Sequence, residues 1–143
     1  WDNNSDGATD TIRSNVWWWN AADMDGDGFL ERRVILFYNH VLIDDDADGN
    51  YSWQRISYIY HLRVLDANGT QIQGWYMHYV MFRHNINHLG HAFYTNATYV
   101  AWAWDASNGW THVITTTWQA WDFDRDGVVD STNYTSAQQS TPP

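Results

Sequence analysis

Residues 54–65 read QRISYIYHLRVL, a stretch in which apolar and polar side chains alternate. In an extended chain one side would carry the apolar set Ile56, Tyr58, Tyr60, Leu62 and Val64. The other side would carry the polar set Arg55, Ser57, His61 and Arg63. A period of two is typical of a β-strand. Asn68-Gly69 follows at once and predicts a hairpin turn of the primed kind, because both residues tolerate positive φ.

The remainder of the chain repeats this β pattern. We expect further strands over residues 11–19, 31–43, 71–84, 92–104 and 110–121, with a second turn at Asn108-Gly109. Helical periodicity is nearly absent, and several strands have apolar residues on both sides. The sequence therefore predicts one all-β, antiparallel, sandwich-like domain over residues 1–130. Residues 131–143, rich in Ser, Thr, Gln and Pro, are expected to form a linker or extended tail.

Acidic residues concentrate in four loops that share one spacing. Of 17 acidic residues, 15 lie in these loops, which leaves only Asp66 and Asp105 elsewhere. The loops are Asp2-Asn4-Asp6-Gly7-Asp10, Asp23-Asp25-Asp27-Gly28-Glu31, Asp44-Asp46-Asp48-Gly49-Ser52 and Asp122-Asp124-Asp126-Gly127-Asp130. Calcium takes six to eight oxygen ligands, and a glycine lets the chain turn sharply around the ion. The pattern predicts up to four calcium ions.

The spacing D-x-D-x-D-G-x-x-[DE] resembles the calcium loops of integrin α-subunit repeats and thrombospondin type 3 repeats. The resemblance implies side-chain ligands at positions 1, 3, 5 and 9 and an extracellular setting. It also implies main-chain carbonyl ligands from Ala8, Phe29, Asn50 and Val128. Ser52 departs from the pattern at position 9. A helical EF-hand is disfavoured because its twelfth position needs Glu, whereas these loops have Arg13, Val34, Arg55 and Asn133 there.

The net charge of −10 comes from the loops. Without the loop acids, seven Arg and two Asp remain, which gives a net charge of +5. Four bound calcium ions would change the net charge of the whole chain from −10 to −2. The scattered Arg residues predict no nucleic-acid partner. No apolar run reaches the roughly 18 residues of a membrane helix. The chain has no cysteine, so bound calcium would stabilise the fold in place of disulfides. We interpret the start at Trp1, without a signal peptide, as that of a processed or partial chain.

A long-range repeat relates the two ends of the predicted domain. Trp1-Asp2-x-Asn4-x-Asp6-Gly7 recurs as Trp121-Asp122-x-Asp124-x-Asp126-Gly127, 120 residues later. The repeat suggests a unit that joins copies of itself end to end, in a homopolymer or a tandem array. Duplication of one loop within a single domain is the alternative.

Eleven Trp, nine Tyr and five Phe make the chain unusually aromatic. Trp17, Trp18 and Trp19 are candidates for stacking on sugar rings or for contact between subunits, since alternation leaves at least one ring away from the core. Further candidates are Trp102, Trp104, Trp110 and Trp118. Core packing is the alternative. Five sequons, at Asn3, Asn50, Asn68, Asn96 and Asn133, are glycosylation candidates, unless they reflect chance in an Asn- and Thr-rich chain.

Three histidines, His84, His88 and His91, share one predicted loop and have a spacing that could hold zinc or copper. No cysteine or carboxylate accompanies them, so chance is the alternative. No nucleophile elbow, cysteine nucleophile or HExxH motif occurs, and we expect no enzyme.

The function predicted from the sequence is that of a calcium-stabilised structural protein of the cell surface. Such a chain would be a subunit of a filament, a surface layer or an adhesin stalk, assembled through aromatic-rich faces and calcium-rigidified loops. The alternative is a secreted, calcium-dependent carbohydrate-binding module whose partner is a polysaccharide.

Overall fold

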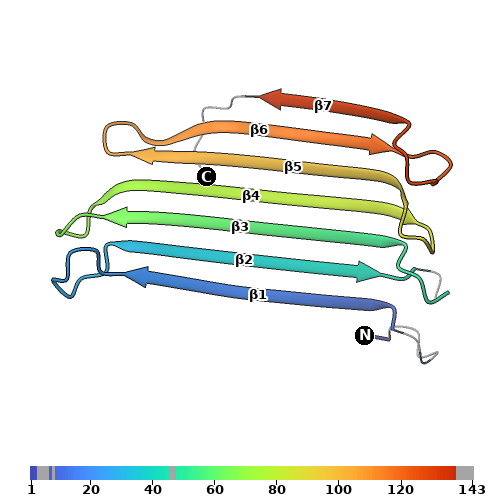
Figure 1. Cartoon of the computed structure of the whole chain (residues 1–143), viewed down its shortest axis with the longest axis horizontal. Coiled ribbons are helices and arrows are strands. Elements are labelled where there is room, and N and C mark those ends of the chain that lie inside the picture. The colour runs from blue at the N-terminus through green and yellow to red at the C-terminus, as the bar shows by residue number, and fades with distance from the viewer. Residues whose placement is uncertain (3–6, 8, 46–47, 138–143) are drawn as a thin grey trace.

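The computed structural model describes residues 1–2, 7, 9–45 and 48–137. These residues form one antiparallel sheet in which each strand pairs with the next one along the chain (Figure 1). Its seven strands are β1 (Thr11–Ala22), β2 (Arg32–Ile43), β3 (Trp53–Leu65), β4 (Gln71–Ile86), β5 (Ala92–Asp105), β6 (Gly109–Trp121) and β7 (Ser131–Ala137).

The all-β, antiparallel class is confirmed, and the six predicted strands agree with β1 to β6 to within three residues at each end. Residues 131–137, which we had placed in the tail, belong to the sheet as the exposed edge strand β7. The described residues contain a single sheet, so both of its faces lack a second layer from this part of the chain. In the same part no helix is long and apolar enough to cross a membrane.

The two Asn-Gly turns differ from the predicted geometry. Gly69 and Gly109 have φ of +80° and +70°, but Asn68 and Asn108 are not among the residues with positive φ. In the first turn the Gly69 amide donates to the Asp66 carbonyl at 2.9 Å, and the strand register shifts at Val64/Leu65. A longer turn followed by a bulge therefore replaces the two-residue primed turn, and only the glycine needs the left-handed conformation.

Strand register sorts the side chains onto two faces, because directly paired residues point to the same side of a sheet. One face carries a row of four directly paired tyrosines, and we call it the tyrosine face. The row is Tyr38, Tyr58, Tyr79 and Tyr99. The opposite face carries the row directly beside it: Phe37, Ile59, His78 and Val100.

Polar groups are packed mainly on the opposite face. Asn39 is buried and its Nδ2 donates to Asn15 Oδ1 at 2.6 Å, while Ser57, also buried, lies 3.3 Å from His78 Nε2. Burial, followed by the nearby Arg55 charge, lowers the pKa of His78. Among the described residues few apolar side chains are buried, namely those of Val34, Ala92, Ala97, Ala101, Trp102 and Ala120. A single layer cannot enclose its larger side chains, so the sheet keeps most of them partly exposed.

Gly74 lies under two tryptophans on the opposite face. A Cβ at this position would be 3.1 Å from both Trp104 Cβ and Trp110 Cη2, and 2.5 Å from Gln71 Nε2. We expect Gly74→Ala to lower the free energy of unfolding by about 1–3 kcal/mol, because overpacking displaces rings that have little room to move. Urea unfolding followed by tryptophan fluorescence measures the change. A variant as stable as the parent chain would contradict this packing.

Candidate metal centres in the acidic loops

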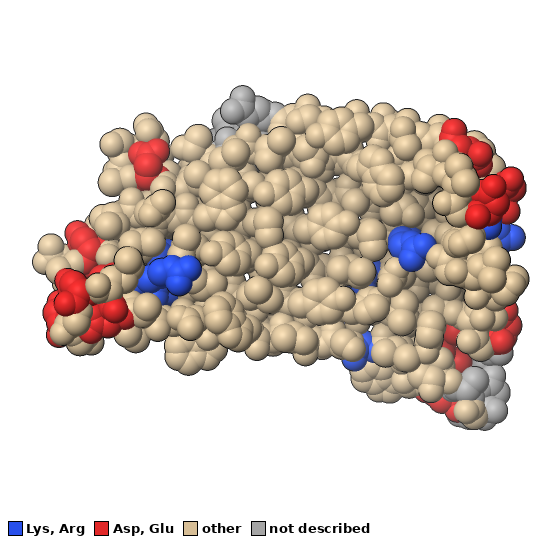
Figure 2. Space-filling view, viewed as in Figure 1, with Lys and Arg blue, Asp and Glu red and all other residues tan. Residues whose placement is uncertain are grey.

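The four acidic loops lie at the two ends of the strands (Figure 1). Loops 2–10, 44–52 and 122–130 share one end, and loop 23–31 lies at the other. In the space-filling view the acidic atoms gather at both ends and leave the middle of the visible face without them (Figure 2). The first and fourth loops were expected at opposite ends of the unit. They lie instead at the same end of the strands and at opposite edges of the sheet, because six strands separate them.

The sixth-position glycine has the same conformation in every loop. Its φ lies between +87° and +97°, a range that favours glycine. In each loop its amide donates to Oδ2 of the first Asp. The four bonds are Gly7 to Asp2 at 3.0 Å, Gly28 to Asp23 at 2.8 Å, Gly49 to Asp44 at 2.8 Å and Gly127 to Asp122 at 2.9 Å. The shared spacing therefore produces a shared backbone turn.

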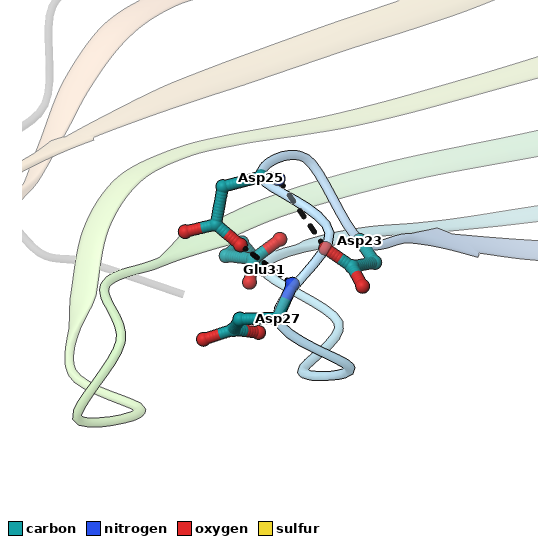
Figure 3. Close-up of side chains that lie close together, drawn as sticks. All are labelled: Asp23, Asp25, Asp27 and Glu31. Atoms are coloured by element: carbon teal, nitrogen blue, oxygen red, sulfur yellow. Dashed lines mark hydrogen bonds between the residues drawn. The ribbon is translucent and has the colours of Figure 1, made fainter.

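Loop 23–31 brings four carboxylates together. Asp23, Asp25, Asp27 and Glu31 each offer an oxygen within 4.8 Å of the others, and Figure 3 shows them gathered in one loop. The amides of Gly28 and Gly26 donate to Asp23 at 2.8 and 2.6 Å. Both bonds lower the pKa of Asp23, and the bond from Gly28 has the larger effect. Four ionised carboxylates repel one another, so the arrangement fits a hard divalent cation.

Glu31 gives an independent indication of a cation. Its side chain is 7% exposed, and Oε2 accepts a hydrogen bond from the Met24 amide at 2.6 Å. Oε1 is buried and has no hydrogen-bond partner in the part of the chain that the structure describes. The Leu65 amide donates to the Glu31 carbonyl at 2.8 Å, which anchors the main chain and holds the carboxylate in place. A buried carboxylate oxygen without a donor is costly, and a bound cation would remove that cost.

Loop 122–130 forms a second convergent group, made of Asp122, Asp124 and Asp130. Asp122 is buried, and Asp130 Oδ2 accepts from the Phe123 amide at 2.6 Å, as Glu31 does from Met24. Asp126, also a predicted ligand, is not in this group. Its Oδ1 accepts from the Val128 amide at 2.7 Å. The structure thus brings together three of the four predicted side chains.

Loop 44–52 has one feature of a cation site. Asp44 is 4% exposed, and its buried Oδ1 has no hydrogen-bond partner among the described residues. Ser52, in place of the ninth-position acid, accepts from the Asp45 amide at 3.2 Å. Asp48 Oδ1 accepts from the Asn50 amide at 2.7 Å. Asp46 lies outside the described residues, so the complete ligand set of this loop stays a prediction.

Loop 2–10 is described only in part. Asp10 is buried, and its carbonyl accepts from the Asp44 amide at 2.7 Å, which ties the first loop to the third. Predicted residues Asn3, Asn4, Asp6 and Ala8 lie outside the described residues. The carbonyl ligands assigned to Phe29, Asn50 and Val128 stay predictions.

The histidine turn supports the fourth loop. His84, His88 and His91 are not among the described groups whose ligand atoms converge. His84 packs against the rings of Trp53, Phe82 and Tyr94 on the opposite face. His91 Nδ1 lies 3.1 Å from the Arg125 carbonyl, which also accepts from Asn87 Nδ2 at 2.9 Å.

Arg125 completes this contact between the two loops. It has a positive φ of 58°, and its Nη1 donates to Asn85 Oδ1 at 3.0 Å. Sequence reasoning missed this support, because only the pairing of β4, β5 and β6 brings residues about 35 to 40 positions apart together. The run of polar residues from His84 to His91 was its only signal.

Two equivalent glycines allow a matched test of that contact. Gly28 and Gly127 have φ of +92° and +97°, but a Cβ on Gly28 meets nothing within 4 Å, whereas one on Gly127 lies 2.9 Å from His91 Cε1. We expect Gly28→Ala to cost about 1 kcal/mol from the backbone alone. Gly127→Ala should cost about 1–3 kcal/mol more. Chemical unfolding with calcium present checks the difference, and equal costs would contradict the packing of His91 on this loop.

The remaining candidates are divided between surface and core. Trp17 and Trp19 are 70% and 74% exposed on the opposite face, and Trp18 is exposed on the tyrosine face. Trp102 is buried, Trp104 and Trp110 contact each other edge to face, and Trp118 is exposed.

The described sequons differ in their surroundings. Asn50 and Asn68 lie in loops, and Asn133 lies on the edge strand β7. Asn96 lies inside β5, where its buried Oδ1 has no hydrogen-bond partner from the described residues. A position within a central strand offers little room for a glycan, which makes Asn96 the weakest of the described sequons.

Comparison of the chain with protein-family models, with curated proteins and with solved structures found no match.

Proposed function

We propose that the chain is a calcium-stabilised structural module of an extracellular surface, such as a subunit of a filament, a surface layer or an adhesin stalk. Two observations carry the proposal: the convergence of Asp23, Asp25, Asp27 and Glu31, and the buried Glu31 Oε1 that has no hydrogen-bond donor among the described residues. Calcium suits this set because all its ligands are oxygens and the loop is compact. Bound ions would neutralise the loops and fix the turns between strands.

The open architecture supports a structural role. Both faces of the sheet expose large apolar side chains, including Trp17, Trp19 and Ile35 on one face and Trp18 and Val16 on the other. Large apolar side chains exposed next to one another are typical of surfaces that associate with another molecule. Burial of these side chains in an assembly would contribute about 25 cal/mol to the free energy of association per Å² of apolar area.

The two edges of the sheet suggest how copies would join. The Trp1 amino group donates to the Thr11 carbonyl at 2.7 Å and the Thr11 amide donates to the Trp1 carbonyl at 3.0 Å. Trp121 pairs with Ser131 at the start of β7 in the corresponding way. The 120-residue repeat thus relates the β1 edge to the β7 edge, and copies would add side by side through the edge strands rather than along the strand direction.

Electron microscopy of the purified chain, with calcium and after chelation, tests the proposal. We expect filaments or sheets in calcium that disperse with chelator and return when calcium is restored. Magnesium at the same concentration is the control, since compact all-protein cages are a poor match for its octahedral geometry. Dispersed particles in calcium at every concentration would contradict a structural polymer.

Carbohydrate binding is the second candidate, favoured by the exposed indoles of Trp17 and Trp19. They lie two residues apart on the same side of the edge strand β1, with the Trp17 ring centroid 4.5 Å from that of Phe37. Flat exposed rings on one side of a strand suit stacking on a polysaccharide. Quenching of tryptophan fluorescence by a polysaccharide, lost in Trp19→Ala, would favour this candidate; no response across a broad panel would remove it.

A further inference from the structure

The two faces of the sheet differ in charge. Among the described strands, the tyrosine face carries only Arg32, Arg83 and Asp105 as charged residues, each at or near the end of its strand. Arg83 is tied down, since Nη1 donates to Gln54 Oε1 at 3.1 Å and Nη2 to the Gly90 carbonyl at 2.5 Å. The opposite face carries four arginines: Arg13, Arg33, Arg55 and Arg63.

The middle of the tyrosine face is mostly apolar or aromatic, with the polar residues Ser14, His40 and Thr116 among its rows. Two rows flank the four tyrosines across the sheet. One row holds Trp18, Leu36, Tyr60, Met77, Ala101 and Ile114. The other holds Ser14, His40, Ile56, Met81, Ala97 and Trp118, and its His40 Nε2 lies 2.8 Å from Gln54 Nε2. Burial raises the pKa of Tyr79, so that phenol is neutral at physiological pH. A sheet face of this composition is suited to packing against another mostly apolar sheet face.

A single layer leaves this surface without a cover from the described residues. Domains are normally built from two packed layers, because a sheet must bury its apolar face. Seven strands of about 12 residues span roughly 30 by 40 Å, or on the order of 1,200 Å² of one face, at ordinary strand spacing and rise. Stable protein interfaces bury about 800 Å² on each partner. One face of this sheet is therefore large enough for a stable contact.

We propose that two copies of the chain stack tyrosine face on tyrosine face, so that the dimer is a two-layer β-sandwich. The inference deepens the proposed function and rests on it, since it names the contact through which an aromatic face of the structural module associates. A copy fits because the middle of its tyrosine face likewise carries no Arg, Asp or Glu among the described strands. The same contact through the opposite face would bring the four arginines of each copy together, and like charges at an interface are unfavourable.

The oligomeric state gives the first test. In calcium, sedimentation equilibrium of the full chain should give twice the 16.8 kDa chain mass, or a multiple of that dimer. Tyr79→Lys should raise the dissociation constant of the dimer at least about 100-fold, because it places an unpaired charge in the middle of the contact. Val80→Lys is the matched control, since Val80 is the next residue of β4 and points to the other face. Far-ultraviolet circular dichroism checks that both variants keep the sheet.

Crosslinking identifies the face without placing a charge in the sheet. The chain has no cysteine, so single cysteines can be introduced without competition. A bismaleimide that spans the roughly 10 Å between stacked sheets should join copies carrying cysteine in the tyrosine row, at position 38, 58, 79 or 99. The paired row on the opposite face, at positions 37, 59, 78 and 100, should give no crosslinked dimer.

The outcomes separate this inference from the proposed function. Crosslinking through the opposite row, or dimers that persist in Tyr79→Lys but dissociate in Val80→Lys, would overturn the tyrosine-face contact, while calcium-dependent assembly would still stand. A chain that binds calcium and stays monomeric at every concentration would overturn both. Dimers lost only in Tyr79→Lys, with crosslinks only through the tyrosine row, would support the sandwich.

Discussion

Removal of calcium should lower the melting temperature of the chain by roughly 10–20 °C. A ligand present at 100 times its dissociation constant stabilises the folded state by about 2.7 kcal/mol per site. Loops 23–31 and 122–130 each contain a convergent carboxylate group, so two sites together would contribute about 5 kcal/mol. For a chain of this size, 1 kcal/mol corresponds to about 2–4 °C. Differential scanning calorimetry with calcium and with excess chelator measures the shift.

Empty loops should also respond to salt. Without an ion, the clustered carboxylates repel one another, and salt screens that repulsion. We therefore expect added sodium chloride to raise the melting temperature in chelator but to have little effect in calcium. A melting temperature that does not change on chelation would contradict structural calcium in these loops.

Substitution of Glu31 should change stability in opposite directions with and without calcium. Glu31→Gln keeps the size of the side chain but removes one charged ligand. In calcium the variant should lose up to about 2.7 kcal/mol of unfolding free energy, the amount a lost site would have contributed. In chelator the variant should gain about 1 kcal/mol of unfolding free energy. The substitution removes a buried carboxylate oxygen that lacks a donor, and with it the repulsion from Asp23, Asp25 and Asp27.

Asp105→Asn provides the matched control for that reversal. Asp105 lies at the same end of the sheet as loop 23–31, but its Oδ1 accepts from the Ser107 and Asn108 amides at 2.9 and 2.8 Å. The hydrogen bond from the Asn108 side chain has the largest effect in lowering the pKa of Asp105, and the bonds from these two amides add to it. Its substitution should destabilise the chain equally in both conditions. Denaturant unfolding of the two variants, each in calcium and in chelator, measures the contrast; a loss in both conditions for Glu31→Gln would reject its role as a ligand.

The strands and the loop turns could be predicted from the sequence because both depend on local chemistry. Alternation over residues 54–65 specifies a strand whatever it pairs with. The sixth-position glycines specify the loop conformation, and Gly28 and Gly127 adopt it although their neighbours differ. The Asn68-Gly69 turn was a partial failure, because the hydrogen bond to Asp66 lengthens the turn and leaves only the glycine with positive φ.

The remaining features depend on contacts that sequence spacing does not encode. Apolar residues on both sides of a strand indicate that both sides are covered, but not whether the cover comes from the same chain. This pattern predicts a sandwich, whereas the described residues form a single sheet. Residues 131–137 look like a tail because their side chains are polar, yet an exposed edge strand needs only main-chain hydrogen bonds to β6. Likewise, the contact of His91 with Arg125 follows from the strand order.

The number of calcium ions bound by each chain shows whether the acidic loops are metal centres. Equilibrium dialysis of the full chain against radioactive calcium, in the presence of magnesium, should give at least two tightly bound ions per chain, as the two convergent groups predict. Glu31→Gln should bind one fewer, and Asp105→Asn should bind as many as the parent chain. Fewer than one ion per chain, even at calcium concentrations on the order of 1 mM, where extracellular calcium modules are occupied, would contradict the account.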